Sequence, residues 1–390
     1  MTNNISLRYC EDYNLDNIRA SLQKCFADLG GITNFVQPKS KVLLNCNLHT
    51  ATNPNEAKTT HPNLVTILAE MLEKAGADCV IAGFPDNHNT NIQKVYETTG
   101  MLDASNNGNA QLNTNLEVFK INFDGVETKE LTLIDAYREA DMVINIPKLV
   151  VDSTIHGALD AYFNLQPAET RIMANKKLFD LTSLYNYQAD LYFALKDKIK
   201  LTIVDAIVAR EACESQRILN AIIMGVNPVH IDNCIYTILN KNFIDSVEYQ
   251  VACKRNIIQN DKVNILGDNI EKFIKLNFSC SQNAISEHIP SHKETRKAVK
   301  KYKHYLARPK IIVKQCKGCE VCTKICPNKA ISIKLDENEE KYACISQNKC
   351  INCFRCVHSC PYTAIKVLTP FKYKQLNNKL NKRLSSKTNN

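Results

Sequence analysis

Eight of the 17 cysteines stand in two matching runs near the C-terminal end of the chain. The first run, CKGCEVCTKICP, extends from Cys316 to Pro327, and the second, CINCFRCVHSCP, from Cys350 to Pro361. Both have the spacing C-x2-C-x2-C-x3-C-P, and each is followed by Ala-Ile at the same offset. The segment is therefore an internal duplication whose repeated spacing is that of thiol ligands.

This spacing is typical of cubane iron–sulfur clusters. Three thiolates of one tight loop bind three corners of a cluster, and the fourth cysteine reaches the other cluster. Structural zinc is the alternative, but zinc sites usually combine two separated pairs of ligands in one tetrahedron. We therefore predict two [4Fe–4S] clusters. The first is assigned to Cys316, Cys319, Cys322 and Cys360, and the second to Cys350, Cys353, Cys356 and Cys326.

Residues 310–367 resemble bacterial-type two-cluster ferredoxins. The resemblance implies a low-potential, one-electron carrier with a β-α-β-β-α-β arrangement, in which each short helix follows a cluster-binding loop. This segment is basic, with nine Lys and Arg against five Asp and Glu between 311 and 367, whereas small ferredoxins of this kind are generally acidic. Lysines such as Lys317, Lys324 and Lys329 oppose the negative charge of reduced clusters and raise their potential.

Charge is unevenly distributed over the rest of the chain. Residues 1–292 hold 26 basic and 34 acidic side chains, whereas residues 293–310 hold eight basic and one acidic. The basic flanks lack interleaved aromatic pairs, so nucleic acid is an unlikely partner. The nine other cysteines show no ligand spacing and are expected to be buried apolar residues, although Cys344 lies between the two motifs.

The first 287 residues show the pattern of an α/β domain. Short apolar runs at 41–44, 79–82, 116–121, 142–146, 201–204 and 218–224 predict strands. A helix is predicted to begin at Pro62 and to end before Gly76, with further helical patterns around 133–140, 178–195 and 228–239. Alternation of this kind predicts a mostly parallel or mixed sheet with helices on both faces.

This N-terminal part resembles the family catalogued as Domain of Unknown Function 362, whose members are often fused to a ferredoxin module. The resemblance implies a fold and a domain partner but no reaction. The matching segments are spread from Ser6 to Asn240: residues 41–47, 58–62 with 74–76, 141–148, 157–158 with Pro167, 201–205 and 227–232.

The departures from the family pattern fall on polar and turn residues. The family tends to have K-P-N where this chain has residues 45–47, K-T-H at 150–152, Lys-Asn at 160–161, and a Gly-rich turn after Asp205. The chain has Asn-Cys-Asn, Val-Val-Asp, Asp-Ala and an alanine-rich segment there. These replacements argue against any catalysis or anion binding common to the family.

Several polar residues nevertheless follow the predicted strands. Ligands of open α/β sheets bind beyond the carboxyl ends of strands, where Asn45, Asn145 and Lys148 stand. The predicted helix start at Pro62 offers N–H groups to a carboxylate or phosphate, or is simply capped by the residues before it. A small anionic ligand is thus expected, if anywhere, at Lys58, Thr60, His61, Lys148 and Asp205. His156 is predicted to be an ordinary helix-start residue, and Asp232 a solvated or capping carboxylate.

These patterns divide the chain into an α/β domain (1–287), a basic linker or helix (288–309), the ferredoxin-type domain (310–367) and a basic tail (368–390). The leading hypothesis is an electron carrier that exchanges single electrons with redox partner proteins. The alternatives are a reductase fed by the ferredoxin module, and an iron–sulfur sensor or binding module. No run of about 18 uncharged apolar residues predicts a membrane span, and the expected location is the cytoplasm.

Overall fold

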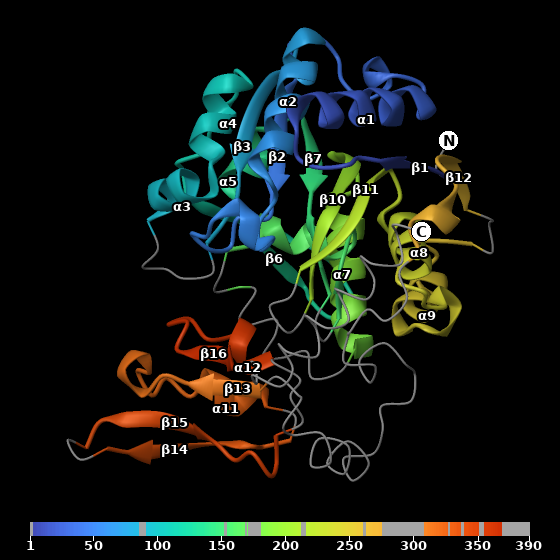
Figure 1. The fold of residues 1–390 in the computed structure, drawn as a ribbon. Helices are drawn as coiled ribbons and strands as arrows, with labels where there is room; N and C mark the ends of the chain where they lie inside the picture. Colours follow the sequence, from blue (N-terminus) through green and yellow to red (C-terminus); the bar gives the residue numbers. More distant parts are fainter. Residues whose placement is uncertain are drawn as a thin grey trace, which may run out of the picture.

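The described residues of the computed structural model form a large α/β domain and a small cysteine-rich domain (Figure 1). The structure describes residues 3–85, 91–151, 154–167, 170, 181–211, 216–259, 263–274, 308–326, 328–336, 339–350 and 355–368. The predicted linker 288–309 lies almost entirely outside these residues, and so does the tail beyond Leu368.

One mixed sheet, of ten strands within the described residues, forms the centre of the large domain. Its main path runs β12-β1-β11-β10-β7-β2-β3-β4, and β8 and β9 extend it beside β10. Along the path from β10 through β7, β2 and β3 to β4, each strand is parallel to the next. Strand β11 is antiparallel to both of its neighbours, β10 and β1. The bounds are β1 Asn4–Tyr9, β2 Lys41–Cys46, β3 Asp78–Ala82, β4 Gln111–Leu112, β7 Met142–Ile146, β8 Lys148–Val151, β9 Ile155–His156, β10 Ile199–Glu211, β11 Gln216–Gly225 and β12 Asn264–Gly267.

Helices cover both faces of this sheet, as predicted (Figure 1). Alternate residues of β2 show why: Val42 and Leu44 pack in the core formed with α1 and α2, while Leu43 packs in another core on the opposite face. The helices are α1 Leu15–Asp28, α2 Pro62–Lys74, α3 Ile92–Thr99, α4 Met101–Asn107, α5 Asp135–Glu139, α7 Leu181–Leu195, α8 Pro228–Ile238 and α9 Val247–Lys254.

Most predicted elements of this domain are found close to their predicted positions. β2, β3, β7, β11, α2 and α8 all coincide with predicted segments within a few residues. Helix α2 ends at Lys74, and Gly76 has a φ of 88°, the left-handed conformation that glycine adopts at a helix end.

Three segments differ from the prediction or extend beyond the described residues. The strand predicted at 116–121 is β5 (Val118–Asn122), which pairs with β6 (Glu130–Ile134) in a separate two-stranded sheet. The helical pattern at 133–140 therefore begins in β6, and only α5 is helical. Part of the helix predicted at 178–195 is α7, and residues 178–180 lie outside the described residues.

The small domain has the β-α-β-β-α-β order that the ferredoxin resemblance implied. It begins with β13 (Arg308–Ile311), two residues before the predicted boundary. The remaining elements are α11 Val321–Ile325, β14 Ile331–Leu335, β15 Lys341–Ile345, α12 Arg355–His358 and β16 Ile365–Leu368. β13 pairs with β16, and β14 pairs with β15, both antiparallel. Each strand that flanks the first cysteine repeat is thus paired with a strand that flanks the second.

Candidate functional site

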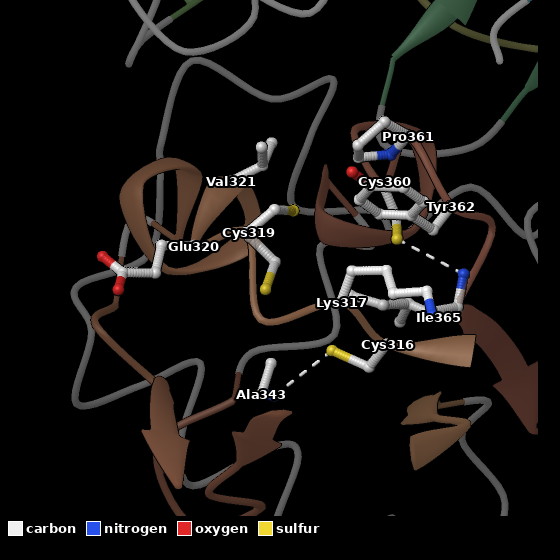
Figure 2. Close-up of a pocket in the computed structure, with 12 residues that line it drawn as sticks. Cys316, Lys317, Cys319, Glu320, Val321, Ala343, Cys360, Pro361, Tyr362 and Ile365 are labelled. Atoms are coloured by element: carbon white, nitrogen blue, oxygen red, sulfur yellow. Dashed lines mark hydrogen bonds between the residues drawn. The ribbon is translucent and has the colours of Figure 1, made fainter. Parts of the chain in front are cut away.

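Four cysteines from the two repeats surround one pocket of the small domain. Cys316, Cys319 and Cys322 come from the first repeat and Cys360 from the second. Figure 2 shows the sulfurs of Cys316, Cys319 and Cys360 turned toward the same hollow. The structure therefore brings together the four residues that the spacing assigns to the first cluster.

Backbone amides donate hydrogen bonds to two of these sulfurs. The Ala343 N–H lies 3.3 Å from Cys316 Sγ, and the Ala364 N–H lies 3.3 Å from Cys360 Sγ (Figure 2). Burial, reinforced by the neighbouring cysteines, raises the pKa of Cys322 to about 12. A metal that binds the Cys322 sulfur must displace the thiol proton, and the N–H donors stabilise sulfurs that carry negative charge.

The duplication seen in the sequence is repeated in the backbone. Ala330 N–H donates to Cys326 Sγ at 3.1 Å, as Ala364 N–H does to Cys360 Sγ. Lys329 and Thr363, the equivalent residues one position earlier, both have positive φ, at 45° and 47°. The fourth cysteine of each repeat is thus held in the same local conformation.

The second set of cysteines is described only in part. Cys350 and Cys356 are buried and Cys326 is half-buried, while Cys353 lies outside the described residues. Cys344 is on β15, paired in register with Ser332, and does not line the pocket of the first set. In the described part of the chain, no three His, Cys, Asp or Glu side chains are grouped so that they could hold a single metal ion, whereas a cubane cluster takes each cysteine at a separate iron corner.

The donors around the first pocket fit an iron–sulfur cluster. All four are cysteine sulfurs, and no histidine or carboxylate lines the pocket except Glu320. Soft thiolates are the usual ligands of such clusters, which take one thiolate at each iron corner. Hydrogen bonds from backbone N–H groups to the sulfurs are among the features that set cluster potentials.

In the large domain, the structure brings three of the five predicted crevice residues, His61, Lys148 and Asp205, into contact, and they bind one another. Lys148 Nζ lies 3.1 Å from Asp205 Oδ2, and both side chains are buried. The backbone N–H of His61 donates to the same carboxylate oxygen at 3.0 Å. Burial lowers the pKa of Lys148, and Asp205 opposes that shift. The lysine charge is therefore neutralised within the protein.

Sequence reasoning missed Tyr13, which covers this pair. Its hydroxyl donates to Asp205 Oδ1 at 2.7 Å and accepts from Lys148 and from the Val208 N–H. The Val208 N–H follows an irregularity in the pairing of β10 with β11, between Ala206 and Val208. Tyr13 lies about 190 positions from Asp205 in a loop, so no local spacing in the sequence marks it.

The side chains predicted to bind an anion at the start of α2 make contacts within the protein instead. His61 caps α2, because its Nδ1 accepts from the Asn63 N–H at 3.2 Å, and its ring stacks on Tyr13 with centroids 3.7 Å apart. Burial lowers the pKa of His61 to about 4, consistent with a neutral ring that accepts at Nδ1. Thr60 donates to the Ile146 carbonyl. Lys58 instead pairs with Glu56 at 2.6 Å, partly exposed.

A second polar group lies beside this one, at the ends of β2 and β7. Asn45 Nδ2 donates to Asn145 Oδ1 at 2.7 Å and to the Ala161 carbonyl at 3.1 Å, and both asparagines are fully buried. Among the described residues, Asn45 Oδ1, Asn145 Nδ2, Asn47 Oδ1 and Thr59 Oγ1 find no hydrogen-bond partner. Buried polar atoms without a partner are uncommon and call for a water or a ligand.

The expectation that Asp232 is solvated was wrong. Its carboxylate is buried and accepts from the N–H groups of Ala158 at 2.6 Å and Leu159 at 2.8 Å. Gly157 permits this approach, because a Cβ there would stand 2.1 Å from Asp232 Oδ1. Burial raises the pKa of Asp232 to about 7 and raises that of the adjacent, buried Glu248 well above its ordinary value.

His156 was predicted to stand at a helix start, and that placement was wrong. His156 lies in β9, immediately before Gly157, and its Nδ1 is 2.9 Å from Asp160 Oδ2. Its side chain is about one-third exposed, at 32%.

The sequence profile described as "Domain of unknown function (DUF362)" matches residues 42–237, half of the chain. The chain belongs to the DUF362 family. A second profile, "4Fe-4S dicluster domain", matches residues 315–364. A dicluster domain implies two [4Fe–4S] clusters, and with them electron transfer to or from redox partners. This DUF362 protein thus carries a C-terminal iron–sulfur domain, as its sequence predicted.

Curated relatives match this DUF362 protein over part of its length. The "Thylakoid-associated protein sll1697" of Synechocystis sp. is 30% identical over 156 residues, 38% of this chain and 46% of the relative. The "Electron transport protein HydN" of Escherichia coli K12 is 38% identical over 55 residues, 14% of this chain and 29% of HydN. The "NADH-quinone oxidoreductase subunit I 2" of Geobacter metallireducens is 37% identical over 62 residues, 15% of this chain and 47% of the subunit. The DUF362 protein therefore spans less than half of each.

Among solved structures, the lactate racemase apoprotein from Thermoanaerobacterium thermosaccharolyticum matches this DUF362 protein weakly. The TM-score is 0.39 at 13% identity, covering 59% of this chain and 56% of the racemase. A likeness at that level carries no argument about activity.

Within the described residues, no helix combines the length and the apolar character that a membrane span requires.

Proposed function

We propose that this chain is a ferredoxin-type electron carrier that passes single electrons between redox partner proteins in metabolic reactions. One observation carries the proposal: cysteines of both repeats surround one pocket, Cys360 joining three cysteines that lie more than 30 positions earlier. We assign the first cluster to that set. We assign the second to Cys350, Cys353, Cys356 and Cys326, on the equivalence of the two repeats.

In this proposal the clusters supply one-electron chemistry at low potential, and the protein residues hold and tune them. Backbone N–H groups of Ala343 and Ala364 donate to ligand sulfurs, which favours the reduced, more negative state. The crossed pairing of β13 with β16 and of β14 with β15 holds the two repeats against each other. Cys360 and Cys326 can then reach across between the repeats.

Metal and sulfide analysis of anaerobically purified protein tests the assignment. We expect about eight iron and eight acid-labile sulfide per chain, because each cubane holds four of each. The protein should also bleach in the visible range when a low-potential reductant is added. Zinc in place of iron, or about four iron, would defeat the proposal.

The unpartnered buried atoms of the large domain favour a second candidate, a reductase whose substrate binds there. Asn45 Oδ1 accepts and Asn145 Nδ2 donates, so the pair matches a small amide or carboxylic acid. Thermal unfolding with a panel of such compounds tests it. A ligand that raises the Tm of the wild type but not of Asn145→Ala supports a substrate site. If no compound in the panel does so, the reductase candidate is rejected and the carrier proposal stands alone.

A further inference from the structure

Exposed lysines surround the loop that holds the first three cysteines. Lys317 stands between Cys316 and Cys319 and lines their pocket (Figure 2). Lys341, on β15, packs against the same loop, because a Cβ on Gly318 would lie 2.5 Å from Lys341 Cβ. Lys314 lies just before the loop and Lys324 lies on α11. All four side chains are exposed.

These four lysines form no ion pair with acidic side chains among the described residues, so their charge is available to a partner protein. No ion pair in the described residues involves Lys314, Lys317, Lys324 or Lys341. Glu320 is the only acid between Ile311 and Leu335. The other acids of the small domain cluster at the turn between β14 and β15, from position 336 to 340. Among the described residues, Glu320 is therefore the one acid within the loop itself.

The same loop is where the cysteine set comes nearest to solvent. Cys319 is exposed, whereas Cys322 is buried. Tyr362 lines the same pocket and is 36% exposed (Figure 2). Electron transfer weakens steeply with distance, so a partner that exchanges electrons with this cysteine set approaches best over Cys319 and Tyr362. The lysines described above lie around that approach.

We propose that the redox partner is a protein with an acidic docking face, which binds over Cys319 and Tyr362 and is held by Lys314, Lys317 and Lys341. The inference rests on the proposed carrier function and adds the chemistry of the partner. Complementary charge steers association and fixes orientation more than it adds affinity. A polyanion such as duplex DNA would bind the same charge, but a single exposed tyrosine beside a cysteine ligand favours a redox protein.

Stopped-flow reduction of the full-length, cluster-loaded protein by an acidic flavodoxin hydroquinone tests the proposal. The second-order rate constant is expected to fall at least about tenfold between low salt and 0.5 M salt, because salt screens steering. The double variant Lys317→Glu/Lys341→Glu should lower the low-salt rate about tenfold, and the matching Gln variant should give a smaller loss. Glu320→Gln should raise it.

A matched control carries the same charge change elsewhere. Lys24→Glu/Lys94→Glu alters exposed lysines of α1 and α3 and should leave the rate within about twofold of the wild type. Iron content and reduction by dithionite are measured for every variant. Loss of clusters in the wild type would reject the carrier function itself, which separates the two failures.

Three results would overturn the docking inference while leaving the carrier intact. The first is a rate that does not change, or that rises, with salt. The second is an equal loss in the control variant, which would show a general effect of net charge. The third is duplex DNA that binds the wild type in low salt and not Lys317→Glu/Lys341→Glu, without any effect of the variant on flavodoxin oxidation.

Discussion

Lys148 and Asp205 form a buried ion pair whose two side chains are 1% and 0% exposed. Asp205 also accepts hydrogen bonds from the Tyr13 hydroxyl and from the His61 backbone N–H. The pair thus connects the loop before α1, the start of α2, β8 and β10. Polar residues at the carboxyl ends of strands, which the sequence offered as a ligand crevice, serve here to join elements of the fold.

Lys148→Met should destabilise the large domain by about 3–5 kcal/mol, because it leaves the Asp205 carboxylate buried without its counter-ion. Urea unfolding followed by far-ultraviolet circular dichroism measures the change, since the chain has no tryptophan to report it. Cluster content and reduction rate should be unchanged.

The double variant Lys148→Met/Asp205→Leu separates the contribution of the ion pair from that of the other hydrogen bonds of Asp205. Replacing both partners removes the uncompensated charge, so we expect much of the lost stability to return. A double variant as unstable as the single one would show that the hydrogen bonds of Asp205, rather than the ion pair, hold these elements together.

The buried carboxyls of Asp232 and Glu248 predict that stability falls as pH rises. Burial raises the pKa of Asp232 to about 7, so the folded protein holds a proton that the unfolded chain has already released above about pH 4. Stabilisation by that proton is complete at low pH and is lost as the pH rises through about 7. The unfolding free energy should decrease with a slope of up to about 1.4 kcal/mol per pH unit from this group.

Glu248→Gln tests this pH dependence because glutamine keeps a hydrogen-bond donor for Asp232 without a titrating proton. The variant should be more stable than the wild type at pH 8 and should show a shallower pH dependence. Glu97→Gln, on an exposed position of α3, is the matched control and should follow the wild-type curve. Parallel curves for Glu248→Gln and the wild type would exclude Glu248 as a source of the pH dependence.

Gly157→Ala should cost about 1–3 kcal/mol or more, because the new methyl group overlaps Asp232 Oδ1 in a packed interior. Thermal unfolding measures the loss. The same change made with Asp232→Ser, which shortens the side chain, should cost clearly less than in the wild type. Equal costs in the two backgrounds would mean that the methyl group is accommodated without contact with Asp232.

Local patterns in the sequence predicted the elements whose determinants are local. Pro62 and Gly76 bound α2, and the cysteine spacing predicted a ferredoxin-type domain whose order of elements is observed. What local pattern did not predict were contacts between distant segments. Tyr13 meets Asp205 across 192 positions, and Asp232 is buried because Gly157 lies against it from another segment.

The buried lysine shows the same limit in energetic terms. A lysine at the end of a strand is usually exposed, so Lys148 was a candidate for binding an anion. Its burial depends on a carboxylate 57 positions later and on a tyrosine 135 positions earlier. Neither partner is marked by the local sequence, so a charge available to a ligand and a charge used within the fold are indistinguishable before the structure is known.

Crossed ligation of the clusters gives a prediction that iron content alone can decide. If Cys326 binds the second cluster, then Cys326→Ala removes about four iron, and adding Cys350→Ala removes no more, because both changes affect the same cluster. Adding Cys316→Ala to Cys326→Ala should instead remove nearly all eight iron, since the two changes then affect different clusters. Cys344→Ala is the matched control and should retain about eight iron.

Uncrossed ligation predicts the opposite iron contents: Cys326→Ala/Cys350→Ala would lose nearly all iron, and Cys326→Ala/Cys316→Ala would keep about four. The two measurements therefore distinguish the two arrangements. The crossed pairing of strands favours the crossed arrangement. The Ile312 N–H, just before the first repeat, donates to the carbonyl of Ala364, which lies four residues after Cys360, at 2.7 Å. In the same way, the Ser346 N–H, just before the second repeat, donates to the carbonyl of Ala330, four residues after Cys326, at 2.7 Å. Each fourth cysteine is therefore followed, four residues later, by a backbone hydrogen bond to the segment that precedes the opposite repeat, which favours crossed ligation.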